Sequence, residues 1–193
     1  MSGKREALID AAKALLWERG YEAMSPKAVL RESGAGQGSL YHHFEGKRDL
    51  AAVALKEVAV QYSANLDKTL DPKLSALKRL EAYLDAPRLA LRGCRFGRLS
   101  SEQAITDPVL NPIVSTYFKH LEDRIADTVR EAQESGDLPK AAKAKDIAMC
   151  LIAIVQGGYV LARTHQDPDS MAQAIAGAKT MLNSLTAQSP NHT

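Results

Sequence analysis

Apolar residues recur along this chain every three or four positions, which is the spacing of α-helices. The clearest stretches are Leu8–Leu16, Ala51–Leu66, Leu110–Val129, Ile147–Tyr159 and Met171–Leu185. No segment alternates apolar and polar residues in the way a half-buried strand does. We therefore expect an all-α protein with about nine helices over roughly 75% of its length, well above the usual ~30–35%.

Short polar residues followed by Pro predict several helix starts, because the side chain caps unpaired amides and Pro needs no N–H there. Five sites fit this pattern: Ser25-Pro26, Asp71-Pro72, Asp107-Pro108, Asn111-Pro112 and Asp167-Pro168. Glycines that follow apolar stretches predict helix ends: Gly20, Gly34 and Gly136.

Further prolines limit two helices in the middle of the chain. Pro87 should end or bend the helix that Pro72 starts. Pro108 and Pro112 cannot both start one regular helix, so either residues 108–111 form a turn or the helix is bent there. The polar tail, residues 187–193, is expected to fray.

Composition narrows the possible environments and partners. The 193 residues, 45% of them hydrophobic, suffice for one or two small domains with a buried core. A formal net charge of +2 excludes a strongly basic coating protein. Two cysteines cannot form a disulfide framework, and no signal peptide is visible, so we expect a cytoplasmic protein. The apolar segment Ile147–Ala162 falls short of a ~20-residue membrane span and contains Gly157-Gly158, which favours a buried helix.

Residues 25–44 predict two short helices joined by a tight turn. Ser25 and Pro26 start the first helix, Gly34-Ala35-Gly36 forms the turn, and Leu40 and Phe44 face the core from the second helix. This pattern is a helix-turn-helix, whose second helix can enter a major groove. Residues 33–44 contain no acid, as a phosphate-facing surface requires. The whole of residues 1–50 supports DNA binding only weakly, with eight Lys or Arg against seven Asp or Glu.

On these residues the chain resembles the TetR family of transcriptional regulators over about residues 4–66. Gly38-Ser39-Leu40-Tyr41-His42-His43-Phe44, followed by Lys47 and Leu50, is similar to that family's recognition helix and the start of its fourth helix. Residues 7–21 are similar to its first helix and turn. Beyond residue 70 the likeness is architectural, although residues 93–99 are similar to a subgroup with a cysteine between helices five and six. The chain departs from the family pattern at Ala35-Gly36 and at Gln37.

The resemblance implies a homodimeric, ligand-responsive transcriptional regulator, most simply a repressor released from a palindromic operator in double-stranded DNA by a small molecule. An N-terminal three-helix domain, residues 1–50, would bind DNA. A C-terminal helical bundle, residues 51–193, would bind the effector and pair its last two helices with those of a second copy. Gly157-Gly158 would permit close helix approach in that pairing. No cofactor, metal or membrane is implied.

The resemblance also assigns roles to individual residues. Contacts to bases or the groove wall would come from Gln37, Gly38, Tyr41 and His42. Phosphate contacts would come from Ser25, Lys27, Ser39, Tyr41, His43 and Lys47. The effector pocket would draw on Tyr62, Tyr83, Cys94, Phe96, Tyr117, Phe118, His120, Gln156, Tyr159 and Arg163. Each of these side chains is also compatible with an ordinary surface or core position.

Several alternatives stay open from the residues alone. Cys94 lies among Arg92, Arg95 and Arg98, where positive charge can activate a thiol, so it is either a sensor or a packing residue. Cys150 is interpreted as packing. His42-His43 is a poor metal pair, because neighbouring helical residues point about 100° apart. No enzyme motif is present, which leaves a helical adaptor as the other alternative to a regulator, and activation as an alternative to repression.

Overall fold

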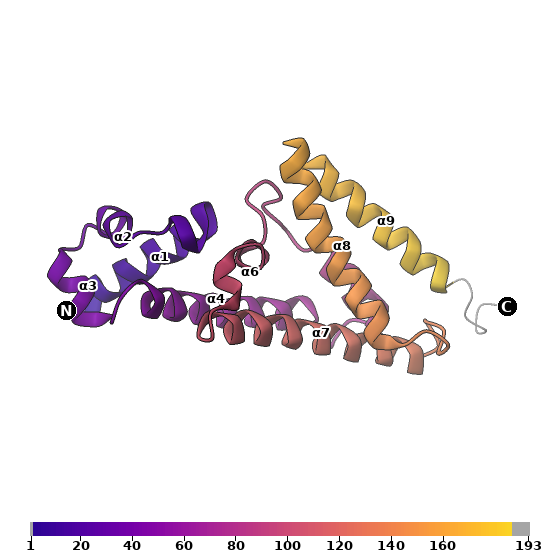
Figure 1. Ribbon diagram of the computed structural model, residues 1–193. Helices are drawn as coiled ribbons and strands as arrows, with labels where there is room; N and C mark the ends of the chain where they lie inside the picture. Colours follow the sequence, from indigo (N-terminus) through magenta and orange to yellow (C-terminus); the bar gives the residue numbers. More distant parts are fainter. Residues whose placement is uncertain (1, 187–193) are drawn as a thin grey trace. The chain divides into compact units, whose positions relative to one another are not determined.

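The computed structural model describes residues 2–186 (Figure 1). Helices make up 78% of the structure and no strand occurs within the described range, which confirms the all-α prediction. The predicted frayed tail lies outside the described residues. The elements in chain order are α1 (Ser2–Ala23), α2 (Pro26–Ser33), α3 (Gln37–His43), α4 (Lys47–Thr69), α5 (Ala76–Asp85), α6 (Arg95–Leu99), η1 (Gln103–Thr106), α7 (Leu110–Glu134), α8 (Ala144–His165) and α9 (Asp169–Thr186).

The helices divide into two compact units. Among the described residues, unit 1 comprises residues 2–62 and 94–117, and unit 2 comprises residues 63–93 and 118–186. The first part of α4 belongs to unit 1 and its last part to unit 2, and the same is true of α7. The division predicted at residue 50 separates DNA binding from effector binding. The two compact units do not test where these functions lie, so that division stays a prediction.

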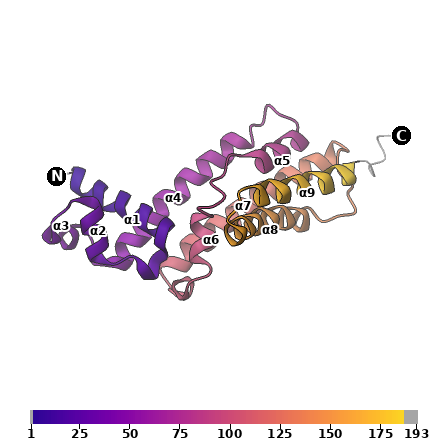
Figure 2. The same ribbon diagram turned by 90° about the horizontal axis from the view of Figure 1, so that it is seen from above.

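Helix α1 is the centre of unit 1, where it contacts α2, α3 and α6 (Figure 2). Its apolar face is buried as the spacing predicts, with Leu8 and Leu15 at 0% and 2% exposure. Leu40 and Leu50 supply fully buried side chains from α3 and α4. Truncation of any of these side chains to Ala would cost about 2–5 kcal/mol of unfolding free energy. The core of unit 1 therefore fixes the orientation of the short helix α3 against α1.

Helices α8 and α9 form an antiparallel pair in unit 2, visible in both ribbon views (Figures 1 and 2). Side chains of α9 pack directly against Gly158, where a Cβ atom would lie 2.6 Å from the Met171 sulfur. Lys179 Nζ of α9 pairs with Asp85 at the end of α5 at 2.7 Å. Within the same unit, Arg124 of α7 pairs with Asp67 of α4 at 3.1 Å.

Two of the predicted helix starts are confirmed, those at Ser25-Pro26 and Asp167-Pro168. Ser25 caps α2 by accepting the Ala28 N–H at 3.1 Å, and α9 begins directly after Asp167-Pro168. The start at Asp71-Pro72 is wrong, because α5 begins at Ala76. Asp71 accepts the Lys73 N–H within a turn, and Ser75 supplies the cap of α5 by accepting the Lys78 N–H.

Of the two alternatives for the residues before α7, the structure has the turn and not the bent helix. The Asp107 carboxylate accepts the N–H groups of Val109 and Leu110 at 2.8 and 3.2 Å, and α7 begins at Leu110. Pro112 then lies in the first helical turn, where no N–H is needed. Pro87 lies just beyond the end of α5, as predicted, and the three glycines predicted to end helices all have positive φ.

Helix α8 corrects two expectations. Only 39% of the most apolar 18-residue stretch of α8 is buried, so α8 is not a fully buried helix. By length and composition alone α8 could cross a membrane, the one such helix among the described residues. Cys150, interpreted from the sequence as a packing residue, is exposed. The apolar spacing identified the helix, but α8 is apolar on two faces and α9 covers only part of that surface.

Candidate nucleic-acid interface

The turn between α2 and α3 is built from local hydrogen bonds and one left-handed residue. Gly34 follows α2 with φ 64°, a conformation that costs glycine little. The Ser33 hydroxyl accepts the Ala35 N–H at 3.2 Å. Gly36 then precedes α3 without a side-chain cap, because glycine has no side chain to accept an N–H. The turn thus sets the start of α3 through backbone geometry alone.

Helix α3 separates an apolar from a polar side. Leu40 of α3 and Phe44, the residue that follows α3, are buried at 1% and 3% exposure. The side chains predicted to contact DNA lie on the other side. Exposed residues are Gln37, Gly38, Tyr41 and His42, and half-buried residues are Ser39 and His43. Tyr41, at 56% exposure, is one of the most exposed large hydrophobic side chains of unit 1. An aromatic side chain held in water on an acid-free helix is suited to contact with a duplex.

The N-terminus of α1 lies beside this polar side. Gly3, Lys4, Ser39, His42 and His43 surround an open hollow of about 460 Å³. Lys4 therefore adds a cation next to three of the predicted contact residues. Sequence reasoning missed Lys4, although its position in the basic run Lys4-Arg5 was an available signal.

Ser25 and Lys27 lie at the start of α2, and both are exposed. The Ser25 oxygen accepts the Ala28 N–H, which leaves its hydroxyl proton able to donate to a phosphate. Lys47, at the start of α4, lies in a more enclosed position. Its ammonium donates to the Glu22 carbonyl at 3.2 Å and lies 4.2 Å from the centre of the Tyr21 ring. Burial lowers the pKa of Lys47, while Glu102 and Glu22 act in the opposite direction.

Three residues of the predicted effector pocket come together in unit 1. Phe96 stacks on Tyr117 with ring centres 4.3 Å apart, and Tyr62 meets both rings edge-on at 5.9 Å. Phe96 is fully buried. Cys94, also in unit 1, is half-buried, and its sulfur accepts the Gly97 N–H at 3.4 Å at the start of α6. The three rings pack against one another, an arrangement typical of a core cluster.

The other predicted pocket residues belong to unit 2. Tyr83 is buried, with the Arg88 guanidinium 5.4 Å from its ring. Tyr159 packs against a small cluster that contains Ala90 and Met171, and Arg163 is exposed beside Gly93. The remaining three predicted pocket residues are half-buried: Phe118, His120 and Gln156.

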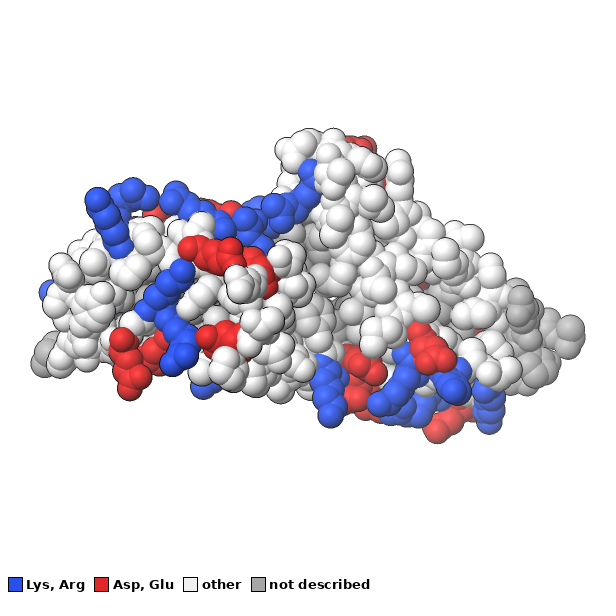
Figure 3. All heavy atoms as spheres, viewed as in Figure 1, with Lys and Arg blue, Asp and Glu red and all other residues white. Residues whose placement is uncertain are grey.

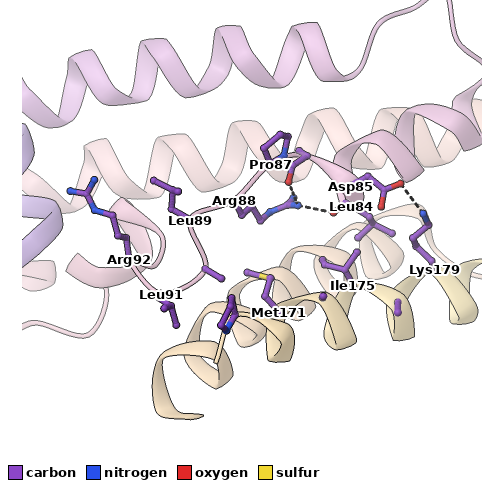
Figure 4. Close-up of a pocket in the computed structure, with 15 residues that line it drawn as sticks. Leu84, Asp85, Pro87, Arg88, Leu89, Leu91, Arg92, Met171, Ile175 and Lys179 are labelled. Carbon is purple, nitrogen blue, oxygen red and sulfur yellow. Dashed lines mark hydrogen bonds and ion pairs between the residues drawn. The ribbon is translucent and has the colours of Figure 1, made fainter. Parts of the chain in front are cut away.

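An apolar groove of about 720 Å³ lies between residues 84–92 and α9 (Figure 4). Its lining includes Leu89, Leu91, Met171 and Ile175, and the Lys179–Asp85 pair lies at one end. Its loop wall is held by Arg88, which donates to the carbonyls of residues 83, 84 and 86 at 2.5–2.8 Å. None of the ten predicted pocket residues lines this groove. Its volume falls within the range of small-molecule sites.

A second exposed surface is apolar. On α8 and α9, Met149, Val160, Leu161 and Met181 are 45–63% exposed. No charged residue occurs from Ile147 to Ala162, and the face drawn in Figure 3 shows few charged side chains over these helices. Gly157 has open space around it, unlike its neighbour Gly158. We name the exposed residues Met149, Cys150, Val160, Leu161 and Met181, together with the half-buried Gly157, the apolar face.

Two family models match most of the chain. Residues 8–54 match the model described as bacterial regulatory proteins of the tetR family. Residues 72–178 match the model described as a tetracyclin repressor-like C-terminal domain. The first match contains α2, α3 and the turn between them, and the second extends from before α5 into α9.

Whole-chain relatives agree with these models. The transcriptional regulator YxaF of Bacillus subtilis is 29% identical over 84% of this chain and 86% of its own length. The transcriptional repressor DhaR of a Mycobacterium species is 24% identical over 88% and 87%. The crystal structure of a regulatory protein TetR from Rhodobacter sphaeroides shares the fold, with a TM-score of 0.81 at 24% identity over 91% of this chain and 96% of that one.

Proposed function

The chain belongs to the TetR family of transcriptional regulators, and on that premise we propose that it is a repressor that binds a palindromic operator as a homodimer and is released by a small molecule. Regulators of this family bind operator DNA, act as dimers and respond to small-molecule effectors. DhaR, a relative over most of its length, is named a repressor, which supports repression over activation. We place the protein in the cytoplasm, where its operator would be.

One observation carries the DNA-binding proposal: the polar side of α3 is exposed and free of acids. Gln37 and Gly38 at the start of α3 are the proposed base contacts together with Tyr41 and His42, and Gln can pair bidentately with adenine. The proposed phosphate contacts are Ser25, Lys27, Ser39, Tyr41, His43 and Lys47. Lys4 joins this set because of its place beside His42 and His43.

The apolar face supports the dimer. Exposed apolar patches in water mark surfaces that a partner covers. A second copy related by two-fold symmetry would also supply the second recognition helix that a palindromic operator requires. The same pairing would account for a long apolar helix in which only 39% of the most apolar window is buried.

The groove of Figure 4 supports effector binding in unit 2. Its lining is mainly apolar, and its loop wall is fixed by Arg88, so the space is preformed. The packed rings of Phe96 and Tyr117 offer less room than this groove. An effector coupling of ~1–3 kcal/mol would weaken operator binding roughly 5- to 150-fold.

The decisive experiment selects DNA duplexes from a random library with the purified protein and measures their affinity by fluorescence anisotropy. We expect a palindromic consensus, bound by two chains. The double variant Gln37→Ala, Tyr41→Ala should lose the consensus while its circular dichroism spectrum stays helical. If no sequence is enriched and the affinity equals that for random DNA, the helical-adaptor alternative replaces this proposal.

A further inference from the structure

Two glutamates in unit 1 cross-link the end of α1 to the segment that follows α6. The Glu102 carboxylate accepts the Glu22 N–H at 2.9 Å. In return, the Glu22 carboxylate accepts the Gln103 N–H at 3.2 Å. Each carboxylate thus binds a backbone amide of the other segment, 80 and 81 residues apart in sequence. We name these two hydrogen bonds the glutamate clasp.

Gly20 makes room for the clasp. Its φ of +82° ends the regular part of α1, and a Cβ atom at this position would lie 2.1 Å from Glu102 Oε1. That oxygen is buried and accepts no hydrogen bond within the described residues. A carboxylate is costly to bury in this way, so the fold places Glu102 here despite an unfavourable environment. Glu102 also precedes η1, but its side chain does not cap η1 and instead binds the Glu22 N–H of α1.

The same peptide of α1 holds Lys47. The Glu22 N–H binds Glu102, and the Glu22 carbonyl accepts a hydrogen bond from Lys47 Nζ at 3.2 Å. The Tyr21 ring lies under the ammonium at 4.2 Å. An ammonium has three N–H donors, so Lys47 keeps donors for an external acceptor while one is bound to Glu22. The position of its charge is therefore set by a residue that Glu102 fixes.

We infer that Glu102 is a positioning residue for DNA binding, which holds the Glu22 peptide so that Lys47 presents its charge to a phosphate. The inference rests on the proposed DNA-binding function. It extends the interface to a residue that lies outside the predicted DNA-binding domain, residues 1–50, and makes no contact with DNA itself. No signal in the sequence pointed to Glu102.

Other contacts keep this part of unit 1 folded when the clasp is removed. The Arg95 guanidinium lies 4.1 Å from the centre of the Trp17 ring and joins α6 to α1 independently. Arg48 and Asp107 approach within 3.9 Å and join α4 to the turn before α7. Loss of Glu102 should therefore release the Glu22 peptide without unfolding the unit.

The test compares Glu102→Ala with Glu102→Gln on the library-selected duplex over a range of salt concentrations. Glu102→Ala removes the acceptor and should lower the salt slope by about one and the affinity by up to about tenfold at 0.1 M salt, as loss of one phosphate contact does. Glu102→Gln keeps an oxygen that can accept the Glu22 N–H, so its slope should match that of the wild type. In a double-mutant cycle, Glu102→Ala should add little once Lys47→Ala is present.

Glu57→Ala is the matched control. Glu57 is an exposed residue of unit 1 that pairs with Lys13 at 2.7 Å, so this variant loses the same charge and one ion pair away from the clasp. It should keep the wild-type slope. Equal slopes for Glu102→Ala and the wild type, or effects of Glu102→Ala and Lys47→Ala that add fully, would overturn the inference.

A measurement without DNA tests the geometry itself. The carboxylate of Glu102 raises the pKa of Lys47 against the effect of burial. Glu102→Gln should therefore lower the Lys47 pKa, measured by NMR of its Cε group, whereas Glu57→Ala should not. An unchanged pKa in Glu102→Gln contradicts the inference even if the wild type binds its operator. If Glu102→Gln lowers the Lys47 pKa but the protein selects no DNA sequence, the result contradicts the proposed function and not the geometry.

Discussion

The polar side of α3 and the apolar face of α8 and α9 are both exposed, but they differ in what exposure costs. Gln37, Tyr41 and His42 carry polar groups that water satisfies, so this surface is stable with or without DNA. Val160 and Met181, each 63% exposed, leave apolar area in water, which favours association. Exposed polar residues thus indicate a surface that can bind and release, whereas the apolar face indicates a lasting partner.

The largest expected effect comes from a charge on the apolar face. Val160→Glu should convert the dimer to a monomer, because two like charges would be buried across the two-fold axis. Operator affinity should fall by at least about 100-fold, since the second half-site contact is lost. Sedimentation velocity and anisotropy measure the two effects.

Val60→Glu is the control for that experiment. Val60 is 72% exposed on α4, so it matches Val160 in residue type and exposure but lies in unit 1. We expect an unchanged oligomeric state. A monomeric wild type, or a Val160→Glu variant that stays dimeric, would show that the apolar face has another role.

A second prediction separates base contacts from phosphate contacts on the DNA side. Gln37→Ala should relax preference at one or two base pairs by ~1–3 kcal/mol. Lys27→Ala should instead weaken binding about equally on all sequences and lower the salt slope by about one. Affinities for a panel of single-base operator variants decide between these patterns. Uniform loss in Gln37→Ala would rule out base reading by this residue.

A third prediction uses a glycine in each region. Gly38 of α3 and Gly157 of α8 both have open space around them within the chain. Alanine at either position should leave the chain as stable as before or ~0.5–1 kcal/mol more stable, as expected in a helix. Gly38→Ala should weaken operator binding alone, and Gly157→Ala should weaken dimerisation alone. Urea unfolding, anisotropy and sedimentation at several concentrations measure the three quantities.

Gly158→Ala is the matched comparison for Gly157→Ala. A Cβ atom at Gly158 would meet the Met171 sulfur at 2.6 Å, so the Met171 side chain has to move. This variant should lower the unfolding free energy, in contrast to its neighbour. Equal effects of the two variants would contradict the division of α8 into an inner and an outer side.

The smallest expected effect concerns thiol reactivity. Cys150 is exposed on the apolar face, so a second chain would cover it, whereas Cys94 is half-buried at the start of α6. Labelling of Cys150 by a thiol reagent should be slow in the dimer and faster in Val160→Glu. Labelling of Cys94 should be the same in both, and Cys150→Ser identifies which thiol reacts. Equal Cys150 rates in dimer and monomer would place Cys150 outside the interface.

The sequence predicted the local features of unit 1 well, because these depend on neighbouring residues. Ser25 caps α2, Gly34 ends it, and Leu40 and Phe44 are buried four positions apart. It failed at Asp71-Pro72, where a turn satisfies the same pattern as a helix start. Lys4 was missed because the hollow beside His42 arises from the packing of α1 against α3.

The sequence by itself determined the helices, the turn between α2 and α3 and the family, since periodicity, caps and short motifs act over a few residues. Only the tertiary structure decided which apolar residues lie outside the core, as at Cys150, and which distant residues meet, as at Glu22 and Glu102. The physical reason is range: hydrophobic spacing shows that a side chain prefers to leave water, but not whether its own chain or a second one covers it. Contacts across 80 residues depend on how the helices pack, which no local pattern records.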